Sequence, residues 1–344
     1  MRNDLHSSLG WRRGLALLCI TMAGLVSLVA SGGSAEAPEC SFFSNVCNPT
    51  GGSGSIPLPP TAVVFPQRLT VQVGGSAVFS VETTGLASPN YQWRRSSDGG
   101  RTYTDIAGAT GPSYTLAGAQ VADDATVFRV GVQGSGGESA FALSQLAVSS
   151  MPGVVMQDAE FLLTDWRVTE IASPAQNGPL HTEERATSGG HPDAFRRLQH
   201  TMPPGLSSLR VFHASQSASY DPAVQGAVHV IDYTEDCIIA SNSTSTALID
   251  SNLLIEQAGR RYVATGLTYC QSPSWVTLPP RSSFGASDFV LIDGPPCGVG
   301  ESCPDFAASA SALRFGFVRH SQATGAGGTI VHGIDNWKVT VWRR

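Results

Sequence analysis

The chain has few charged residues for its length. Only 14% of its 344 residues are Asp, Glu, Lys or Arg, and the formal net charge is −6. A nucleic-acid partner would require a basic face, so this balance argues against one. Helical periodicity is also scarce, whereas 37 glycines and 21 prolines are present. This composition suits exported β-domains better than helical enzymes or disordered chains.

Catalytic signatures are missing as well. The sequence contains no Gly-x-Ser-x-Gly elbow, His-Glu-x-x-His helix or phosphate-binding glycine loop. His181 with Glu183 and Glu184 could indicate acid–base chemistry, but a polar loop with solvated charges is the preferred interpretation. Glu235 and Asp236 are adjacent, so on a strand they would point to opposite faces and would fit a glycosidase carboxylate pair poorly. The remaining histidines show no ligand spacing: His191, His200, His229, His320 and His332. We therefore predict that the chain is not an enzyme.

The N-terminal segment reads as a targeting signal. Arg12-Arg13 precede an apolar run from Gly14 to Ala30, and Ala35-Glu36-Ala37 offers a small-x-small cleavage site. A membrane anchor is the alternative, but it needs about 20 apolar residues. No later segment is long and apolar enough to span a bilayer. We expect residues 1–37 to be a signal peptide and the product to be secreted, periplasmic or on the cell surface.

The cysteines predict disulfides. Removal of the signal peptide leaves six: Cys40, Cys47, Cys237, Cys270, Cys297 and Cys303. An even number in an exported chain favours disulfide bonds over free thiols. Six cysteines allow 15 connectivities, and spacing favours two short loops, Cys40–Cys47 and Cys297–Cys303, with Cys237–Cys270 as the third pair. Metal binding is the rival interpretation, but no Cys-x-x-Cys pair occurs. Lipidation at Cys19 or Cys40 lacks the small residue expected before a modified cysteine.

A Gly/Ser/Pro-rich linker over residues 38–60 leads into short alternating strands separated by glycine turns. Such strands over residues 61–149 predict a β-sandwich. The expected strands are 69–73, 77–81, 91–95, 113–116, 126–130 and 141–148. Trp93, flanked by polar residues on the third strand, is the expected core residue.

The motifs Gly74-Gly-Ser-Ala-Val-Phe-Ser-Val81, Tyr91-Gln-Trp93 and Asp123-Asp-Ala-Thr-Val-Phe-Arg-Val130 resemble those of bacterial immunoglobulin-like repeats. The cysteine pair usual in that family is absent. Phe79 or Val81 and Val130 stand in those places, so Trp93 should pack on apolar side chains. The resemblance implies a spacer or adhesive module.

Residues 150–344 continue the β pattern, which predicts a larger two-sheet sandwich or jelly roll. The expected strands are 160–163, 166–171, 194–201, 209–213, 227–233, 237–240, 261–269, 289–293, 313–319 and 336–342, and only 246–257 could hold a helical turn or two. Near the C-terminus, Trp337, Val339 and Val341 share one face, and Asp335 falls in phase with them.

This ending, with Gly189-Gly-His-Pro-Asp-Ala-Phe-Arg196 upstream, resembles jelly-roll modules of the galactose-binding and lectin-like kind. The resemblance implies a structural Ca²⁺ held by Asp335, by Asp158 or Glu160, and by a carbonyl near Gly190. Calcium takes 6–8 oxygens, so this set alone is incomplete. The alternative is that Asp335 caps a turn through backbone N–H groups, and no other cofactor is expected.

A glycan site would use an aromatic platform with polar neighbours. The candidates are Trp275, in the loop-like Ser272-Pro-Ser-Trp275, with Tyr233 and His213; Tyr262 and Tyr269 are further aromatics of this kind. Packing inside the fold is the competing explanation for each.

These observations predict an all-β, non-enzymatic secreted or cell-surface binding or adhesion protein. An immunoglobulin-like spacer would present a jelly-roll module to a glycan or a surface protein. The alternatives are a carbohydrate-active hydrolase or lyase with unplaced catalytic carboxylates, and a purely structural envelope role.

Overall fold

The computed structural model describes residues 17–20, 26–29, 59–175, 180–206, 208–244, 248–266, 268–292, 297, 303–322 and 327–344. The chain divides into two compact units, residues 1–58 and 59–344. In the first unit, β1 (Leu17–Ile20) pairs antiparallel with β2 (Val26–Val29). The rest of the predicted signal peptide, most of the linker, and Cys40 and Cys47 lie outside the described residues. Within the described part of the chain, no helix has the length and apolar character needed to cross a membrane.

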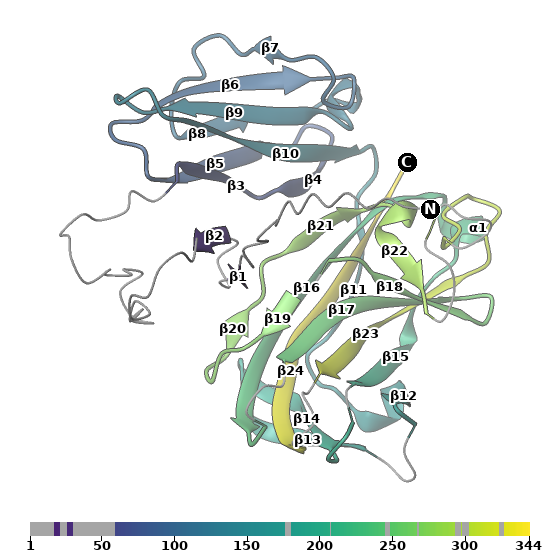
Figure 1. Ribbon diagram of the computed structural model, residues 1–344. Helices are drawn as coiled ribbons and strands as arrows, with labels where there is room; N and C mark the ends of the chain where they lie inside the picture. The colour runs from purple at the N-terminus through teal and green to yellow at the C-terminus, as the bar shows by residue number, and fades with distance from the viewer. Residues whose placement is uncertain are drawn as a thin grey trace, which may run out of the picture. The chain divides into compact units, whose positions relative to one another are not determined.

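The second unit begins with two small sheets (Figure 1). One has the strand order β3-β5-β8, and the other has the order β4-β10-β9-β6-β7 with β4 and β10 parallel. The strands are β3 (Thr61–Phe65), β4 (Arg68–Gln72), β5 (Ala77–Thr84), β6 (Asn90–Ser96), β7 (Thr104–Asp105), β8 (Ser113–Leu116), β9 (Val127–Gln133) and β10 (Ser139–Ser149), with a 3-10 turn at η1 (Val121–Asp123). The sequence predicts each of these strands except β3 and β7.

Trp93 is fully buried between these sheets. Its indole N–H donates to the Gly111 carbonyl at 3.0 Å, and its ring centroid lies 6.3 Å from that of Phe79. Val81 and Val130 belong to the same apolar cluster. The cross-link that a disulfide would supply is thus replaced here by apolar burial, as the sequence predicts.

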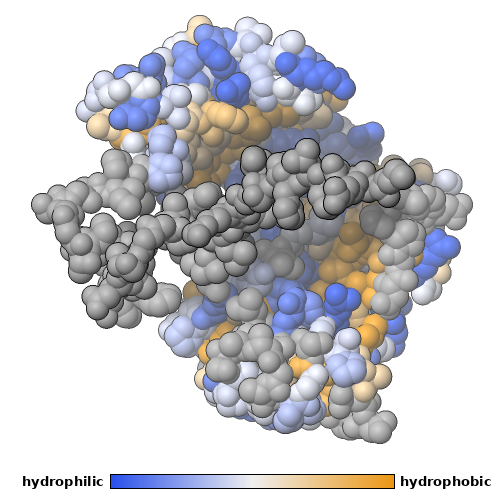
Figure 2. Space-filling view, in the orientation of Figure 1, coloured by the Kyte–Doolittle hydropathy of each residue, from blue (hydrophilic) through white to orange (hydrophobic). Residues whose placement is uncertain are grey.

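The surface of this sandwich is mixed in character. Figure 2 shows hydrophilic residues around β6 and β7 and hydrophobic ones on the side of β3 and β5. Val63 and Phe65 on β3 and Val78 on β5 are 38%, 47% and 53% exposed.

Residues 154–343 form two seven-stranded sheets, which we name after their central strands (Figure 1). The β24 sheet has the order β13-β14-β24-β16-β20, with β11 on β24 and β21 on β16; the β23 sheet has the order β12-β15-β23-β17-β18-β22, with β19 on β17. The strands are β11 (Val154–Asp158), β12 (Trp166–Ser173), β13 (His181–Gly190), β14 (Asp193–Met202), β15 (Ser208–Tyr220), β16 (Val228–Asn242), β17 (Leu248–Gln257), β18 (Arg260–Ala264), β19 (Thr268–Cys270), β20 (Val276–Thr277), β21 (Arg281–Phe284), β22 (Phe289–Leu291), β23 (Leu313–Gln322) and β24 (Gly328–Arg343).

Aromatic side chains from both sheets fill the space between them. Trp166 meets the rings of Phe317 on β23 and Trp337 on β24 edge to face, each at 5.2 Å between centroids. Phe315 and Val339 are fully buried in the same cluster. Trp337, Val339 and Val341, which were predicted to share one face of the last strand, are all buried in this cluster.

The local predictions were wrong in several places. The expected strands 227–233 and 237–240 form the single strand β16, and 261–269 is divided between β18 and β19. Strands β11, β20 and β21 were not predicted. The segment 160–163 is a turn before η2 (Leu163–Asp165) and not a strand, because Asp158 accepts hydrogen bonds from the following backbone N–H groups. Within 246–257, where helical turns were possible, residues 248–257 form strand β17. The polar loop expected around His181 is strand β13. The short helix α1 (Pro222–Gln225), capped by Asp221, was not predicted.

Two disulfides lie in this part of the chain. Cys237 on β16 bonds to Cys270 on β19, with 6.0 Å between Cα atoms, and so joins the two sheets. Cys297 bonds to Cys303, with 4.7 Å between Cα atoms. Both pairs are those that the spacing favours.

Candidate functional site

A hollow of about 370 Å³ lies on the outer face of the β24 sheet, within the size range of small-molecule sites. Exposed Lys338 alternates with buried Trp337 and Val339, so Lys338 marks the outward side of β24. The polar residues that line the hollow come from strands far apart in the sequence: Gln157, Asp158, Thr234, Glu235, Asp236, Thr277, Asn336 and Lys338.

Trp275 lies close to this hollow, just before β20. Its indole N–H donates to the Gly189 carbonyl at 2.7 Å, and its ring packs edge to face on Phe195 at 5.1 Å. Gly333 lies against the ring, because a Cβ built there would be 2.8 Å from Trp275 Cη2. The indole is thus held by the sheet in one orientation, and it is half-buried.

A polar group separates Trp275 from the hollow. Asp236 Oδ2 lies 2.8 Å from His191 Nδ1 and accepts a 2.7 Å hydrogen bond from Asn336 Nδ2, which also donates to the His191 carbonyl. Asp236 on β16 pairs with Asp335 on β24, and Ile238 pairs with Gly333. The second pair, which lies against Trp275, is two residues or about 7 Å along the strands from the first pair. Aromatic and polar groups therefore line one continuous strip. Sequence reasoning did not assign His191, Asp236, Asn336 or Lys338 to a binding site, although the Gly189–Arg196 motif contains His191 and Asn336 follows Asp335 directly.

Asp335 adopts the turn-capping role that was the alternative to calcium. Its Oδ2 accepts from the backbone N–H of His191 at 2.6 Å and its Oδ1 from that of Asn336 at 2.7 Å. Burial raises the pKa of Asp335, and these two hydrogen bonds act in the opposite direction. A Cβ at Gly190 would lie 2.7 Å from Asp335 Oδ2, so only glycine allows this close approach.

The other predicted calcium ligands are engaged elsewhere. Asp158 accepts hydrogen bonds from two backbone N–H groups and, through Oδ2, from Trp166 Nε1 at 2.8 Å. Glu160 lies at the surface and forms an ion pair with Arg185. The structure brings Gly190 to Asp335 but does not direct Asp158 or Glu160 there, so the calcium site stays a prediction.

Tyr233 and His213, the weaker glycan-site candidates, lie inside the fold. Tyr233 is 3% exposed and His213 is fully buried, so neither is available to a ligand on the surface. Tyr262 is buried as well, whereas Tyr269 is 39% exposed. Of the three residues proposed to bind a glycan, Trp275 remains.

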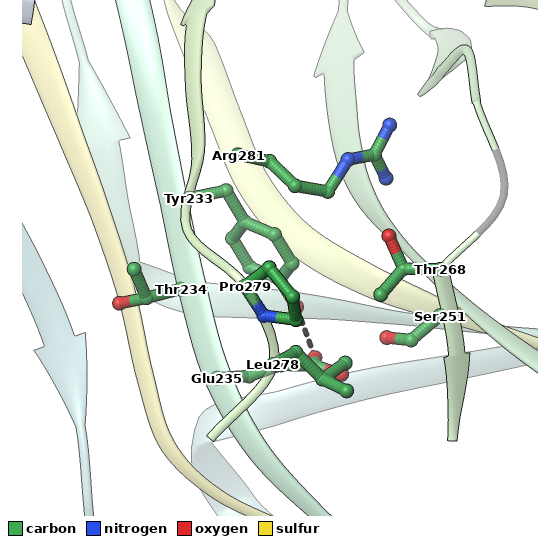
Figure 3. A pocket seen from close by; sticks show the side chains of 8 residues that line it. All are labelled: Tyr233, Thr234, Glu235, Ser251, Thr268, Leu278, Pro279 and Arg281. Atoms are coloured by element: carbon green, nitrogen blue, oxygen red, sulfur yellow. Dashed lines mark hydrogen bonds between the residues drawn. The ribbon is translucent and has the colours of Figure 1, made fainter. Parts of the chain in front are cut away.

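Tyr233 borders a small cavity of about 10 Å³, room for one water molecule (Figure 3). Its hydroxyl donates to Glu235 Oε2, and Arg319 Nη1 donates to Glu235 Oε1 at 2.7 Å. Arg319 is fully buried, and Glu235 is 1% exposed. Glu235 is thus a buried, paired carboxylate that borders both this small cavity and the hollow of the β24 sheet.

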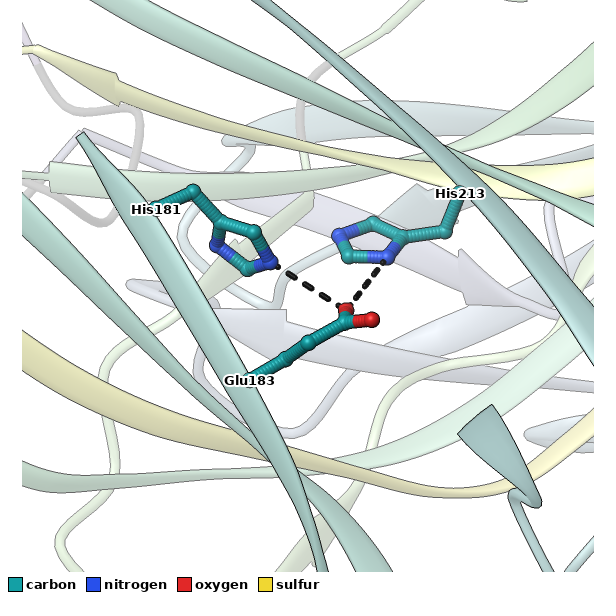
Figure 4. A group of neighbouring side chains, drawn as sticks. All are labelled: His181, Glu183 and His213. Carbon is teal, nitrogen blue, oxygen red and sulfur yellow. Dashed lines mark hydrogen bonds and ion pairs between the residues drawn. The ribbon is translucent and has the colours of Figure 1, made fainter. Parts of the chain in front are cut away.

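A second polar cluster joins the two sheets near the edge strand β13 (Figure 4). His181 and Glu183 lie two residues apart on β13 and share a face, and His213 reaches them from β15 in the other sheet. One donor atom from each residue falls within 4.8 Å of the other two. The alternation of residues 181, 183 and 185 could have indicated a strand with these side chains on one face. The interpretation of the segment as a polar loop did not use it.

Burial and charge set the ionisation of this cluster. Burial alone would raise the pKa of Glu183, but contacts with His181, His213 and Arg196 hold it well below its usual range. Burial lowers the pKa of His213 to about 3, against the opposing effect of Glu183. The cluster therefore holds an ionised carboxylate next to a neutral imidazole.

Comparison with known proteins gives partial matches. Residues 66–149 match a family described as a domain of unknown function (DUF8696). Endoglucanase C of Cellulomonas fimi is 31% identical over 107 residues, which is 31% of this chain and 9% of that protein. The chain thus spans less than a tenth of this relative's length.

Among solved structures, the N-terminal four Ig domains of Dscam1 isoforms 6.9 and 4.44 show 27% and 26% identity, with TM-scores of 0.22 and 0.23. The matches cover 26% and 27% of this chain and 21% and 22% of those chains.

Proposed function

We propose that this chain is an exported, non-enzymatic carbohydrate-binding protein. The glycan would stack on Trp275 and place its hydroxyl groups in the polar hollow of the β24 sheet. The orientation of Trp275 carries the proposal. Gly189, Phe195 and Gly333 hold the indole, and its partial exposure makes part of the ring accessible to a ligand.

The chemistry of the strip supports a sugar. Asp236, Asn336 and Lys338, which line the hollow, supply a carboxylate, an amide and an ammonium group. Glycans are bound by such planar and charged hydrogen-bonding groups beside an apolar surface. The disulfides support export, and the partial match to an endoglucanase makes β-glucans the first ligands to test.

Calorimetric titration of the purified chain with cello-oligosaccharides and soluble β-glucans, followed by a glycan array, tests the proposal. We expect Trp275→Ala to weaken binding on the order of tenfold, because an aromatic contact contributes about 1 kcal/mol beyond its buried area. Tyr269→Ala removes an exposed aromatic side chain from the β23 sheet and should bind as the wild type does.

Two results would contradict the proposal: a wild-type chain that binds no glycan, or a Trp275→Ala variant with unchanged affinity. Release of reducing ends during the titration would instead support the hydrolase alternative. Parallel melting curves in calcium and in chelator test the ion proposed at Asp335, and equal melting temperatures would exclude a stabilising Ca²⁺.

A further inference from the structure

The distances in the cluster of His181, Glu183 and His213 are those of ligands around one metal ion. Glu183 Oε2 lies 3.2 Å from His181 Nε2 and 3.4 Å from His213 Nδ1. Two ligands at tetrahedral positions around Zn²⁺ lie roughly 3.3–3.5 Å apart, since each bond measures about 2.0–2.2 Å. The two histidine nitrogens lie within 4.8 Å, so this edge would have to shorten by at most about 1.4 Å.

Hydrogen bonding does not account for the buried imidazole of His213. This side chain is fully buried and stacks on Phe317, with 4.3 Å between ring centroids. Nδ1 has only the long contact with Glu183, and among the described residues Nε2 has no hydrogen-bond partner. A buried polar atom left unpaired destabilises the fold. Coordination by Nδ1 would satisfy the nitrogen that faces Glu183.

Arg196 orients the carboxylate of Glu183. Its Nη2 lies 2.6 Å from Oε1, and its Nε donates to Oε2 at 3.1 Å. Oε2 also faces the two imidazoles (Figure 4), so a metal ion would share this oxygen with Arg196. The positive charge of the Arg196 guanidinium repels a bound metal ion. We therefore expect the metal to bind more weakly here than at a site with four protein ligands. Three protein ligands leave a fourth position for water.

We propose that His181, Glu183 and His213 form a divalent transition-metal site that takes Zn²⁺ and joins the two sheets. Two imidazoles and one carboxylate suit Zn²⁺ better than Ca²⁺, which prefers oxygen ligands only. This site is separate from the glycan strip, and it does not depend on the proposed function.

The test uses the full mature chain without a histidine tag. The protein is loaded with Zn²⁺, dialysed against metal-free buffer and analysed for bound metal. Replacement by Co²⁺ then reports the coordination geometry by visible absorption. We expect one Zn²⁺ per chain, a tetrahedral Co²⁺ spectrum, and a melting temperature that falls when a chelator is added. His181→Gln and His213→Gln should each weaken binding at least roughly tenfold, since each removes a direct ligand.

His320→Gln is the matched control. His320 Nδ1 also faces a buried carboxylate, Asp250 Oδ2 at 3.1 Å, but this pair belongs to no three-residue group among the described residues. The control should therefore keep full metal uptake. A wild-type chain without stoichiometric Zn²⁺, or one whose uptake survives in the His181→Gln/His213→Gln double variant, would overturn the proposal. If His213→Gln fails to fold, His181→Gln at the edge strand decides alone.

Discussion

His332 shows what a buried ionisable residue costs the fold. It is fully buried on β24, its ring lies 4.7 Å from that of His200, and neither of its nitrogens has a hydrogen-bond partner among the described residues. Burial lowers the pKa of His332 well below its usual value. The native state therefore keeps this imidazole neutral, whereas the unfolded chain can protonate it.

This difference predicts how stability depends on pH. The unfolded histidine binds a proton below its usual pKa of about 6.5 while the buried one does not, so stability is present above that pH and is lost as the pH falls. We expect His332→Leu to make this loss smaller by about 1.4 kcal/mol per pH unit between pH 6 and 4. Urea unfolding in chelator at several pH values measures it. Identical slopes for both proteins in that range would contradict the prediction.

At the residue scale, the sequence predicted burial best where it follows from the alternation of neighbouring residues on the same strand. Trp337, Val339 and Val341 share the core face of β24 as predicted, but Asp335 is not in phase with them. A bulge at Asn336 shifts the register, so Ile334 enters the core cluster in its place, although Asp335 is itself fully buried. The same rule applies to Arg196, which is in phase with Leu198 on β14. It was not predicted as an interior residue, because a buried guanidinium needs a partner, and Glu183 is 13 residues away on another strand.

At the scale of elements, β13 shows why a polar strand is difficult to recognise. Its residues His181 to Gly190 include few apolar side chains, and its place in the sheet depends on pairing with β14. This pairing puts His181 opposite His200 and leaves the other side of β13 at the sheet edge. Sequence patterns detect strands with an apolar face, so edge strands with polar interior residues escape them.

Gly333 on β24 tests how an element supports the proposed glycan site. A Cβ there would lie 2.8 Å from Trp275 Cη2 and 2.9 Å from Ile238 and Phe195. Gly333→Ala should therefore displace the indole, destabilise the fold by about 1–3 kcal/mol and weaken glycan binding. Denaturant unfolding and calorimetric titration measure the two effects.

The control for this variant is Gly131→Ala on β9, where an added Cβ meets nothing closer than 3.9 Å. It should leave glycan affinity unchanged. If Gly333 acts through the indole, its effect on binding should vanish when Trp275 is already alanine, because the two changes remove the same contact. Additive losses would show that Gly333 acts elsewhere.

At the scale of the whole chain, the sequence predicted the disulfide pairs better than it predicted the residues that line a surface hollow. The Cys297–Cys303 pair needed only proximity along the chain, and the cysteines that remained gave Cys237–Cys270. The hollow needed β11, β16, β20 and β24 side by side. Strand order sets that arrangement, and no local pattern encodes it. Trp275 was predicted as a ligand-binding residue because Ser272-Pro-Ser-Trp275 is typical of a loop, and this does not depend on strand order.

The two disulfides should contribute unequally to stability. Cross-linking restricts the unfolded chain more when the closed loop is longer. The sequence separation is 33 residues for Cys237–Cys270 and 6 residues for Cys297–Cys303. From loop entropy, we expect Cys237→Ala/Cys270→Ala to cost about 3–4 kcal/mol and Cys297→Ala/Cys303→Ala about 2 kcal/mol. Denaturant unfolding of both double variants, beside wild-type protein with and without reductant, measures these losses. Cys237–Cys270 also joins β16 to β19 across the two sheets, which gives a second reason for its larger contribution. A larger loss of stability on removing Cys297–Cys303 would contradict the loop-length argument.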